Sequence, residues 1–368
     1  MEIDDARAAP GSAAAEAARA FAPEGAALRL ARLGRGHIHD TFAVEIDGPK
    51  ARPLVLQRLN THVFPDPAAV MQNLVRIASH LLDWSRQQGL SHPERRALPP
   101  LRTRSGLLLH RDAEGGVWRA LPLIERSRSV AFPESPAQAH AAARAFGAFA
   151  AALAELPGPP LAVVIPRFHD LPGRCLALRE AARADRAGRA AEVRAELDAA
   201  LRAAERLAEV AQAPLPRVPV HNDCKLDNLL FDAESGEALC VVDLDTCMEG
   251  TRLFDFGELA RTASCPFAED EIAQGGLRVE PALLEALARG YRAGAGAGLA
   301  DAELRALPRA GALMALENAV RFLTDHLDGD RYFRTERADH NLLRCRAQLR
   351  RSELLDAARD VVSRALGV

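Results

Sequence analysis

Most of the information in this chain lies in one stretch, Val220-His221-Asn222-Asp223-Cys224-Lys225-Leu226-Asp227-Asn228. It contains the order His-x-Asp-x-Lys-x-x-Asn, and a later apolar segment ends in Asp243, fifteen residues beyond Asn228. Transfer of a phosphoryl group from a nucleotide requires such a set of groups. A carboxylate orients the acceptor hydroxyl, a cation neutralises the moving phosphate, and an amide and a second carboxylate hold magnesium. The spacing therefore predicts phosphoryl transfer that depends on ATP and Mg²⁺.

Each polar residue of this pattern has a predicted role. Asp223 is the predicted catalytic base for the acceptor hydroxyl, and Lys225 is the predicted contact to the transferred phosphate. Asn228 and Asp243 are the predicted magnesium ligands, because Mg²⁺ prefers hard oxygen donors. We expect His221 to brace the loop through hydrogen bonds to nearby backbone.

A predicted hairpin explains how the two metal ligands come together. Residues 229–231 and 238–242 are apolar, and the Glu-Ser-Gly sequence between them is typical of a turn. Antiparallel pairing of these strands brings Asn228 and Asp243 to the same end of the hairpin. Asp245, two residues after Asp243, either assists the metal site or caps the next turn.

A plainer interpretation applies to each residue alone. An isolated Asp in a loop is usually a turn former, and a single His-x-Asp occurs often by chance. His221, Asp223 and Asp243 could also be ligands in a metal phosphohydrolase. That alternative leaves the position of Lys225 and the strand-rich N-terminal part unexplained. The joint pattern therefore favours a kinase.

The chain changes from strands to helices along its length. Apolar alternation predicts strands at 28–33, 41–46 and 54–59, then a helix at 66–85 capped by Asp66 and a hairpin from 107–109 to 117–121. Helical periodicity follows at 136–155, 176–213, 281–296, 301–328 and 339–366. We therefore expect an α+β, protein-kinase-like two-lobe fold. Its expected parts are a disordered or peripheral tail (1–27), a small β-rich nucleotide-binding lobe (28–125), and a larger helical lobe with the catalytic loop and substrate pocket (126–368).

The N-terminal lobe carries the candidate nucleotide contacts. Gly34 and Gly36 lie in a turn between two predicted strands, and glycine lets a backbone approach phosphate closely. The turn does not complete a G-x-G-x-x-G pattern, so an ordinary hairpin turn is the plainer interpretation. In the third strand, where a kinase usually carries a lysine, the chain has Gln57 and Arg58. Neighbouring strand residues face opposite ways, so only one of these two can point into the cleft.

Composition narrows the class of protein. The 368 residues are 48% hydrophobic and 26% charged, with a net charge of -3. These values are typical of a globular protein without the basic surplus that non-specific nucleic-acid binding needs. No apolar run reaches the length of a membrane span, and the basic start and apolar run of a signal peptide are missing. The six cysteines form no C-x-x-C pair, so we expect reduced thiols in a cytoplasmic protein. From the charge and the lack of a membrane span we expect neither nucleic-acid nor membrane partners.

Further motifs establish a resemblance to a known family. The catalytic loop, Val241-Val242-Asp243-Leu244-Asp245-Thr246 and Phe254-Asp255-Phe256-Gly257 resemble the aminoglycoside phosphotransferase / choline kinase-like superfamily. Within it, the chain looks most like the N-acetylhexosamine 1-kinases. That similarity lies in three stretches, Gly36-His37-Ile38-His39-Asp40-Thr41-Phe42, Leu56-Gln57-Arg58-Leu59-Asn60-Thr61-His62-Val63-Phe64 and Arg321-Phe322-Leu323-Thr324-Asp325-His326-Leu327. The resemblance extends from about residue 28 to residue 350.

The resemblance implies a substrate and its contacts. N-acetylhexosamine 1-kinases phosphorylate the anomeric hydroxyl of N-acetylglucosamine or N-acetylgalactosamine with ATP and magnesium. It places Arg321 and Tyr332 in the sugar pocket and His37 close to the acceptor. Arg321 could instead pair with Glu317, one helical turn earlier, and Tyr332 could be a core residue. One departure is Asn222, because much of the superfamily has glycine at that position.

Other functions remain as alternatives. Another sugar, an amino alcohol or an aminoglycoside could be the acceptor. Aminoglycosides are polycations and need a carboxylate-lined pocket, whereas the acidic run Glu269-Asp270-Glu271 is expected on a solvated surface. A nucleotide-binding regulator without catalysis is disfavoured by the complete catalytic set. A protein kinase is disfavoured because no activation segment is recognisable between Asp243 and Phe254. The sequence leaves the acceptor and the oligomeric state open.

Overall fold

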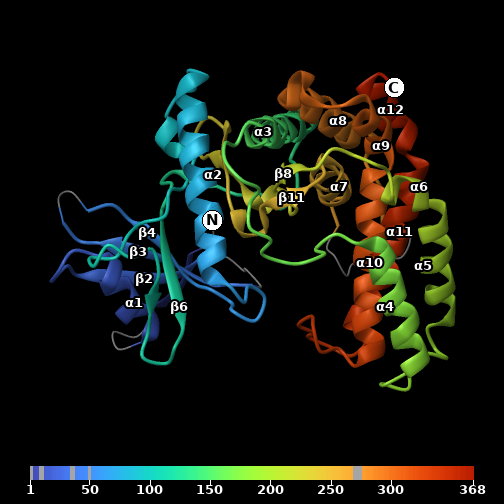
Figure 1. Cartoon of the computed structure of the whole chain (residues 1–368), viewed down its shortest axis with the longest axis horizontal. Coiled ribbons are helices and arrows are strands. Elements are labelled where there is room, and N and C mark those ends of the chain that lie inside the picture. Colours follow the sequence, from blue (N-terminus) through green and yellow to red (C-terminus); the bar gives the residue numbers. More distant parts are fainter. Residues whose placement is uncertain (1–2, 8–11, 34–37, 49–50, 268–275) are drawn as a thin grey trace. The chain divides into compact units, whose positions relative to one another are not determined.

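Residues 3–7, 12–33, 38–48, 51–267 and 276–368 are described by the computed structural model of the chain (Figure 1). The chain divides into two units. The first unit comprises Met1–Ser129, Glu155–Pro166 and Leu229–Met248, and the second comprises Val130–Ala154, Arg167–Asn228 and Glu249–Val368. Each unit therefore combines separated segments of the chain, which differs from the single boundary near residue 125 expected from the sequence.

A six-stranded antiparallel sheet forms the centre of the first unit. Its strands lie in the order β1 (Ile3–Arg7), β2 (Leu28–Leu33), β3 (Asp40–Ile46), β4 (Leu54–Arg58), β6 (Val117–Pro122) and β5 (His110–Arg111). The three strands predicted between residues 28 and 59 are confirmed. The hairpin predicted to end in β6 also forms, but its first strand is β5 at His110–Arg111 and not the expected 107–109.

One face of this sheet is covered by helix α1 (Ala13–Phe21). Ser12 caps the helix, since its side chain accepts a hydrogen bond from the Ala15 backbone N–H. The alanines of α1 pack with Leu54, Leu56 and Trp118 in one buried cluster. The small side chains let the helix lie close to the sheet. Residues 13–21 therefore contribute to the core, in contrast to the disordered or peripheral tail expected for 1–27.

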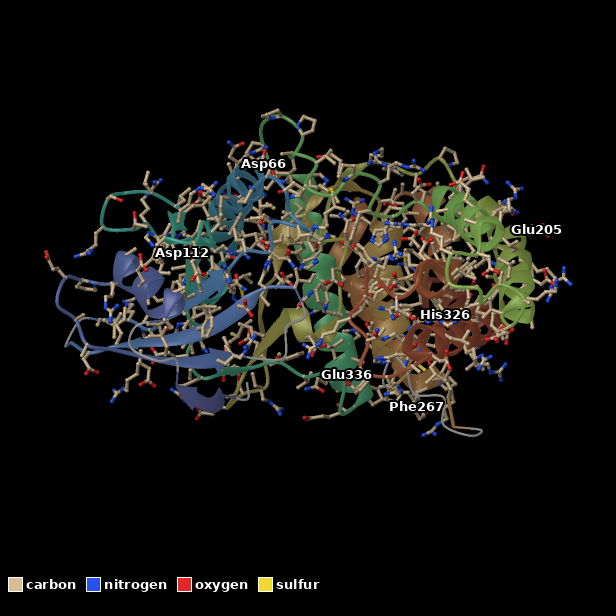
Figure 2. All side chains as sticks on the ribbon, turned by 90° about the horizontal axis from the view of Figure 1, so that it is seen from below. Asp66, Asp112, Glu205, Phe267, His326 and Glu336 are labelled. Atoms are coloured by element: carbon tan, nitrogen blue, oxygen red, sulfur yellow. The ribbon has the colours of Figure 1, made fainter. Side chains whose placement is uncertain are left out.

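Helix α2 (Pro67–Gln87) confirms the helix predicted at 66–85. Asp66, labelled in Figure 2, is the N-cap and accepts hydrogen bonds from the backbone N–H groups of Ala68 and Ala69. Proline at the first helical position has the required φ and needs no hydrogen-bond partner for its nitrogen. The buried residues recur at helical spacing, including Val70, Leu74, Ile77 and Leu81. This stripe packs the helix into the first unit.

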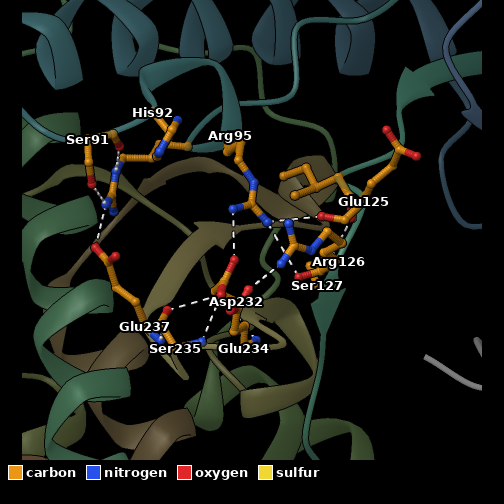
Figure 3. A network of polar contacts seen from close by, with 12 residues as sticks. Ser91, His92, Arg95, Glu125, Arg126, Ser127, Asp232, Glu234, Ser235 and Glu237 are labelled. Carbon is orange, nitrogen blue, oxygen red and sulfur yellow. Dashed lines mark hydrogen bonds and ion pairs between the residues drawn. The ribbon is translucent and has the colours of Figure 1, made fainter.

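The predicted hairpin is confirmed and belongs to the first unit. Strand β9 (Leu229–Asp232) pairs antiparallel with β10 (Ala238–Val241) and with β7 (Ser127–Arg128). Figure 3 shows the polar network around its turn. Asp232 accepts hydrogen bonds from Arg95 Nη1 at 2.8 Å and from the Ser235 backbone N–H at 2.9 Å. Asp232 therefore links the hairpin to Arg95 of the first unit and also holds the turn of the hairpin through Ser235.

The second unit consists mainly of helices. Their bounds are α3 (Pro136–Ala154), α4 (Leu171–Ala184), α5 (Arg194–Arg206), α6 (Ala208–Ala211), α7 (Arg252–Ala263), α8 (Pro281–Ala295), α9 (Asp301–Ala306), α10 (Ala310–Asp328), α11 (His340–Ala357) and α12 (Arg359–Leu366). The single helix expected at 176–213 is divided, because Asp185 ends α4 in the left-handed conformation (φ 42°). In the described part of the chain, no helix has the length and apolarity needed to cross a membrane.

Glycines allow α3 and α8 to lie side by side (Figure 1). A Cβ atom on Gly147 would lie 2.3 Å from the Tyr291 backbone oxygen, and one on Gly294 would lie 2.0 Å from that of Arg144. Both distances are far shorter than a van der Waals contact. The two helix backbones therefore meet directly. Close to this helix pair, strand β8 (Val218–Val220) leads into the His221–Asn228 loop.

Candidate active site

The start of the His221–Asn228 loop is anchored by buried groups of the second unit. His221 is fully buried, and its ring lies 5.7 Å from the Phe149 ring, centroid to centroid. Asp255, in the first turn of α7, accepts hydrogen bonds from the backbone N–H groups of His221 (3.1 Å) and Asn222 (2.7 Å). The Asp223 N–H donates to His221 Nδ1 at 3.2 Å. The prediction that His221 braces the loop is confirmed.

Asn222 adopts the left-handed conformation, with φ at 66°. This region is disfavoured for most residues, while glycine enters it freely and asparagine tolerates it. Asparagine therefore fits this backbone conformation better than most residues that carry a Cβ.

Asp223 is the centre of the loop and interacts with both other predicted groups of this unit. The Lys225 ammonium lies 3.1 Å from Asp223 Oδ2, and Asn228 Nδ2 donates to the Asp223 backbone oxygen (2.9 Å) and to Oδ2 (3.1 Å). Burial raises the pKa of Asp223, but the Lys225 ammonium and these hydrogen bonds lower it by more. The net pKa lies below its usual value, so Asp223 is a carboxylate at neutral pH.

Asn228 has a side chain suited to a cation. Its Nδ2 is held by Asp223, so Oδ1 is the atom left to act as a ligand. Asn228 directly precedes β9, and Leu229 pairs with Val241, two residues before Asp243. An amide oxygen and a carboxylate are the hard donors that Mg²⁺ prefers. The donor set therefore fits the magnesium ion that the sequence predicts.

His169, which the sequence patterns did not identify, also supports the loop through a contact with Asn222. Its Nε2 lies 2.9 Å from the Asn222 backbone oxygen, and its Nδ1 lies 2.9 Å from Glu317 Oε1. Both neighbours are acceptors, so both ring nitrogens carry protons. Burial lowers the pKa of His169 and the Glu317 carboxylate raises it by more, so the pKa is raised. A buried imidazolium–carboxylate pair thus holds the loop at Asn222.

A pocket of about 330 Å³ opens beside the loop, and its described lining belongs entirely to the second unit. Catalytic-loop residues and aromatic rings make up part of this lining. The side chains that bear charge are Asp223, Asp227 and Glu258, and Lys225, Arg261, Arg321, Arg351 and the His169 imidazolium. Glu258 forms an ion pair with Arg261 on the same helix. The pocket therefore combines the predicted base with a mixed set of charges.

Arg321, one of the predicted contacts to the acceptor, lines this pocket together with Asp223. Its guanidinium lies 5.3 Å from the centre of the Phe333 ring, and it donates to Asn318 Oδ1 at 3.4 Å. Glu317, the alternative partner of Arg321, instead binds His169. Tyr332 is 65% exposed and is not among the lining residues.

The segment that follows Arg321 is held by Asp325. Its carboxylate accepts hydrogen bonds from the backbone N–H groups of Arg331, Tyr332 and Phe333, at 2.9, 2.8 and 2.9 Å. This fixes the Phe333 ring that contacts Arg321. The Asp in the Arg321–Leu327 stretch therefore has a structural role close to the pocket.

In the first unit, Gln57 and Arg58 face opposite sides of the sheet. The Gln57 Oε1 atom accepts from Arg119 Nε at 2.9 Å, and Arg58 lies over the Trp118 ring at 5.9 Å, on the side covered by α1. Arg119 in turn binds Asp245. Gln57 therefore shares a side with the residues that follow Asp243, and Arg58 does not. Gly34, Gly36 and His37 lie outside the described residues.

A sequence model of the phosphotransferase enzyme family matches residues 29–307. The crystal structure of a spectinomycin phosphotransferase in complex with ADP and spectinomycin has a TM-score of 0.58, with 11% identity over 90% of this chain and 92% of that chain. An aminoglycoside phosphotransferase from Alicyclobacillus acidocaldarius has a TM-score of 0.52, with 13% identity over 90% and 92%. These likenesses confirm the expected α+β, protein-kinase-like fold.

Proposed function

Because the chain belongs to the phosphotransferase enzyme family, we propose that it phosphorylates a small molecule with ATP and Mg²⁺, and that the acceptor is an N-acetylhexosamine at its anomeric hydroxyl. The observation that carries this proposal is the placement of Asp223, Lys225 and Arg321 around one pocket. With ATP as donor, the reaction belongs in the cytoplasm.

Asp223 acts mainly by orienting the acceptor. Its lowered pKa makes it a weak base, which suits a loose transition state in which the hydroxyl loses its proton late. Lys225, held 3.1 Å from Asp223, offers positive charge to the phosphoryl group during transfer. Asn228 and Asp243 would hold the magnesium ion, which would neutralise the phosphates of the nucleotide. Gln57 is the better candidate of the strand pair for a nucleotide contact, because Arg58 faces α1.

The charges of the pocket favour an uncharged acceptor. An aminoglycoside carries several ammonium groups and requires carboxylates that are not already neutralised. The described lining offers three carboxylates against four lysine and arginine side chains and the His169 imidazolium, and Glu258 is bound to Arg261. An N-acetyl group removes the positive charge of an amino sugar, so such a sugar avoids repulsion from Arg321. Hydroxyl and carbonyl oxygens of the sugar are acceptors for the Arg321 guanidinium.

An acceptor panel tests the proposal. ATP consumption would be followed by a coupled assay with N-acetylglucosamine, N-acetylgalactosamine, the unacetylated amino sugars, an amino alcohol and an aminoglycoside. We expect the highest kcat/KM with an N-acetylated sugar, and phosphorus NMR of the product should show an anomeric phosphate. A higher kcat/KM with a cationic acceptor would refute the acceptor assignment. Absence of phosphorylated product with every member would count against phosphoryl transfer to this class of molecule.

A further inference from the structure

A buried ion pair links β6 to the turn that follows Asp243. Arg119 Nη1 lies 2.5 Å from Asp245 Oδ1, and Arg119 Nη2 lies 2.8 Å from Asp245 Oδ2. The two residues are 1% and 3% exposed. A buried bidentate ion pair allows little variation in the positions of its two side chains. Removal of either partner leaves an uncompensated buried charge. Asp245 is therefore held in one position relative to the sheet.

His39, which directly precedes strand β3, also binds the Asp245 carboxylate. The Asn60 backbone N–H donates to His39 Nδ1 at 3.1 Å, so this nitrogen is an acceptor and carries no proton. The proton must lie on Nε2, which is 2.8 Å from Asp245 Oδ2. His39 is thus a neutral donor whose tautomer is set by backbone. The Asp245 carboxylate receives three hydrogen bonds from Arg119 and His39, which suits an anchor better than a metal ligand.

The anchored turn has an unusual backbone. Asp243 adopts the left-handed conformation (φ 60°, ψ 53°) and leads into a single 3₁₀ turn, Leu244–Thr246. This conformation is disfavoured for most residues other than glycine, although aspartate adopts it more readily than most. The turn is held at Asp245 by the ion pair and at the Cys247 backbone oxygen by Asn73 Nδ2 (3.2 Å). Both attachments lie within the first unit.

Arg119 also lies beside Gln57, which belongs to the strand where a kinase usually carries a lysine. It is the cross-strand partner of Gln57, and its Nε donates to Gln57 Oε1 at 2.9 Å. We propose that Arg119 and His39 are positioning residues, which fix Asp245 and so hold the backbone turn that presents Asp243 to the magnesium of the bound nucleotide. This inference rests on the proposed function, since it takes Asp243 as a magnesium ligand.

Two substitutions at His39 separate positioning from simple loss of packing. His39→Gln can place an amide N–H near the position of Nε2, so it can keep the donor to Asp245. His39→Asn can place its amide near the position of Nδ1, so it keeps the contact to Asn60 and loses the donor. The probe is Mn²⁺ in the presence of ADP, titrated by electron paramagnetic resonance of free Mn²⁺. This binding measurement does not depend on turnover or on the acceptor.

We expect His39→Asn to weaken Mn²⁺ binding to the ADP complex about 10-fold or more, the range seen when a residue that orients a metal ligand is removed. His39→Gln should weaken it clearly less, and Arg119→Lys should fall between wild type and His39→Asn. Arg32→Met, which breaks the exposed Arg32–Asp40 ion pair, is the matched control on the same sheet. Near-ultraviolet circular dichroism and thermal unfolding establish that each variant is folded.

Equal Mn²⁺ affinity of His39→Asn, His39→Gln and wild type would overturn the positioning role while leaving the proposed function intact. Equal weakening by both His39 variants would also overturn it, because then the donor to Asp245 is not what matters. If wild type binds ADP but no Mn²⁺, the magnesium assignment of Asp243 fails and the inference falls with it. A failure confined to the acceptor panel would leave these titrations unaffected.

Discussion

The Asn228 side chain donates from a single nitrogen to both the backbone oxygen and Oδ2 of Asp223. One residue therefore orients the proposed base and, through its remaining oxygen, is available to the proposed metal ion. The 3₁₀ turn Leu226–Asn228 returns the asparagine to the start of the loop, so both contacts to Asp223 are possible. A change in either side chain should therefore affect more than one function of the loop.

Replacement of the proposed base should abolish most turnover. We expect Asp223→Asn to lower kcat by about 10²- to 10⁴-fold, the usual effect of removing a positioned acid–base group. ADP affinity should change little, because the amide is isosteric and can still accept from Asn228. Steady-state kinetics and calorimetric ADP titration measure the two effects, with Glu45→Gln, which alters an exposed ion pair with Arg29, as control. Near wild-type kcat in Asp223→Asn would exclude it as the base.

Arg321 should act on the acceptor and not on the nucleotide. Loss of a charge-assisted hydrogen bond is worth roughly 1.5–3 kcal/mol, so Arg321→Met should raise KM for the acceptor about 10- to 100-fold. Arg321→Lys should show a smaller increase, and KM for ATP should stay near its wild-type value. Arg350→Met removes an exposed arginine paired with Glu353 and serves as control. A change confined to KM for ATP would contradict the acceptor role.

The backbone of Asn222 gives a stability test. Asn222→Ala should destabilise the protein by about 1–2 kcal/mol, because a Cβ without a polar side chain is disfavoured at positive φ. Asn222→Gly loses the same side chain but has no such restriction, so it should be more stable than Asn222→Ala. Urea unfolding measures the difference between the two variants. If both lose equal stability, the side chain rather than the left-handed conformation determines the residue at this position.

The His169–Glu317 pair predicts a pH dependence of stability. The pKa of His169 is raised in the folded protein, so its contribution is full below the unfolded value of about 6.5 and is lost as pH rises through the folded pKa. Glu317→Gln removes the carboxylate that raises this pKa. The difference in Tm between wild type and Glu317→Gln should therefore be largest near pH 6 and shrink at higher pH.

Thermal unfolding across pH 6 to 9 tests the sign of this effect. Glu205→Gln, which alters an exposed glutamate on α5 (Figure 2), should show no comparable trend. A difference for Glu317→Gln that grows with pH would mean that His169 is neutral in the folded protein at pH 6.

Local sequence signals were sufficient for much of the architecture. The Asp66–Pro67 cap, the alternating strands and the hairpin from Leu229 to Val241 are set by contacts between residues close in sequence, so pattern alone predicted them. Breaks inside long helices were missed, since they depend on single residues such as Asp185 in the left-handed conformation. Helix α1 was missed as core because its alanines gain their burial from a sheet formed later in the chain.

The same distinction holds for the candidate site. The sequence by itself was sufficient to predict the chemistry of the loop, because Asp223 lies within hydrogen-bonding reach of both Lys225 and Asn228 inside a single turn. Only the tertiary structure decided which distant groups hold that chemistry in place. His169 and Glu317 are 148 residues apart, Arg119 and Asp245 are 126 apart, and His39 and Asp245 are 206 apart. No sequence period relates such partners, because their meeting depends on how whole sheets and helices pack.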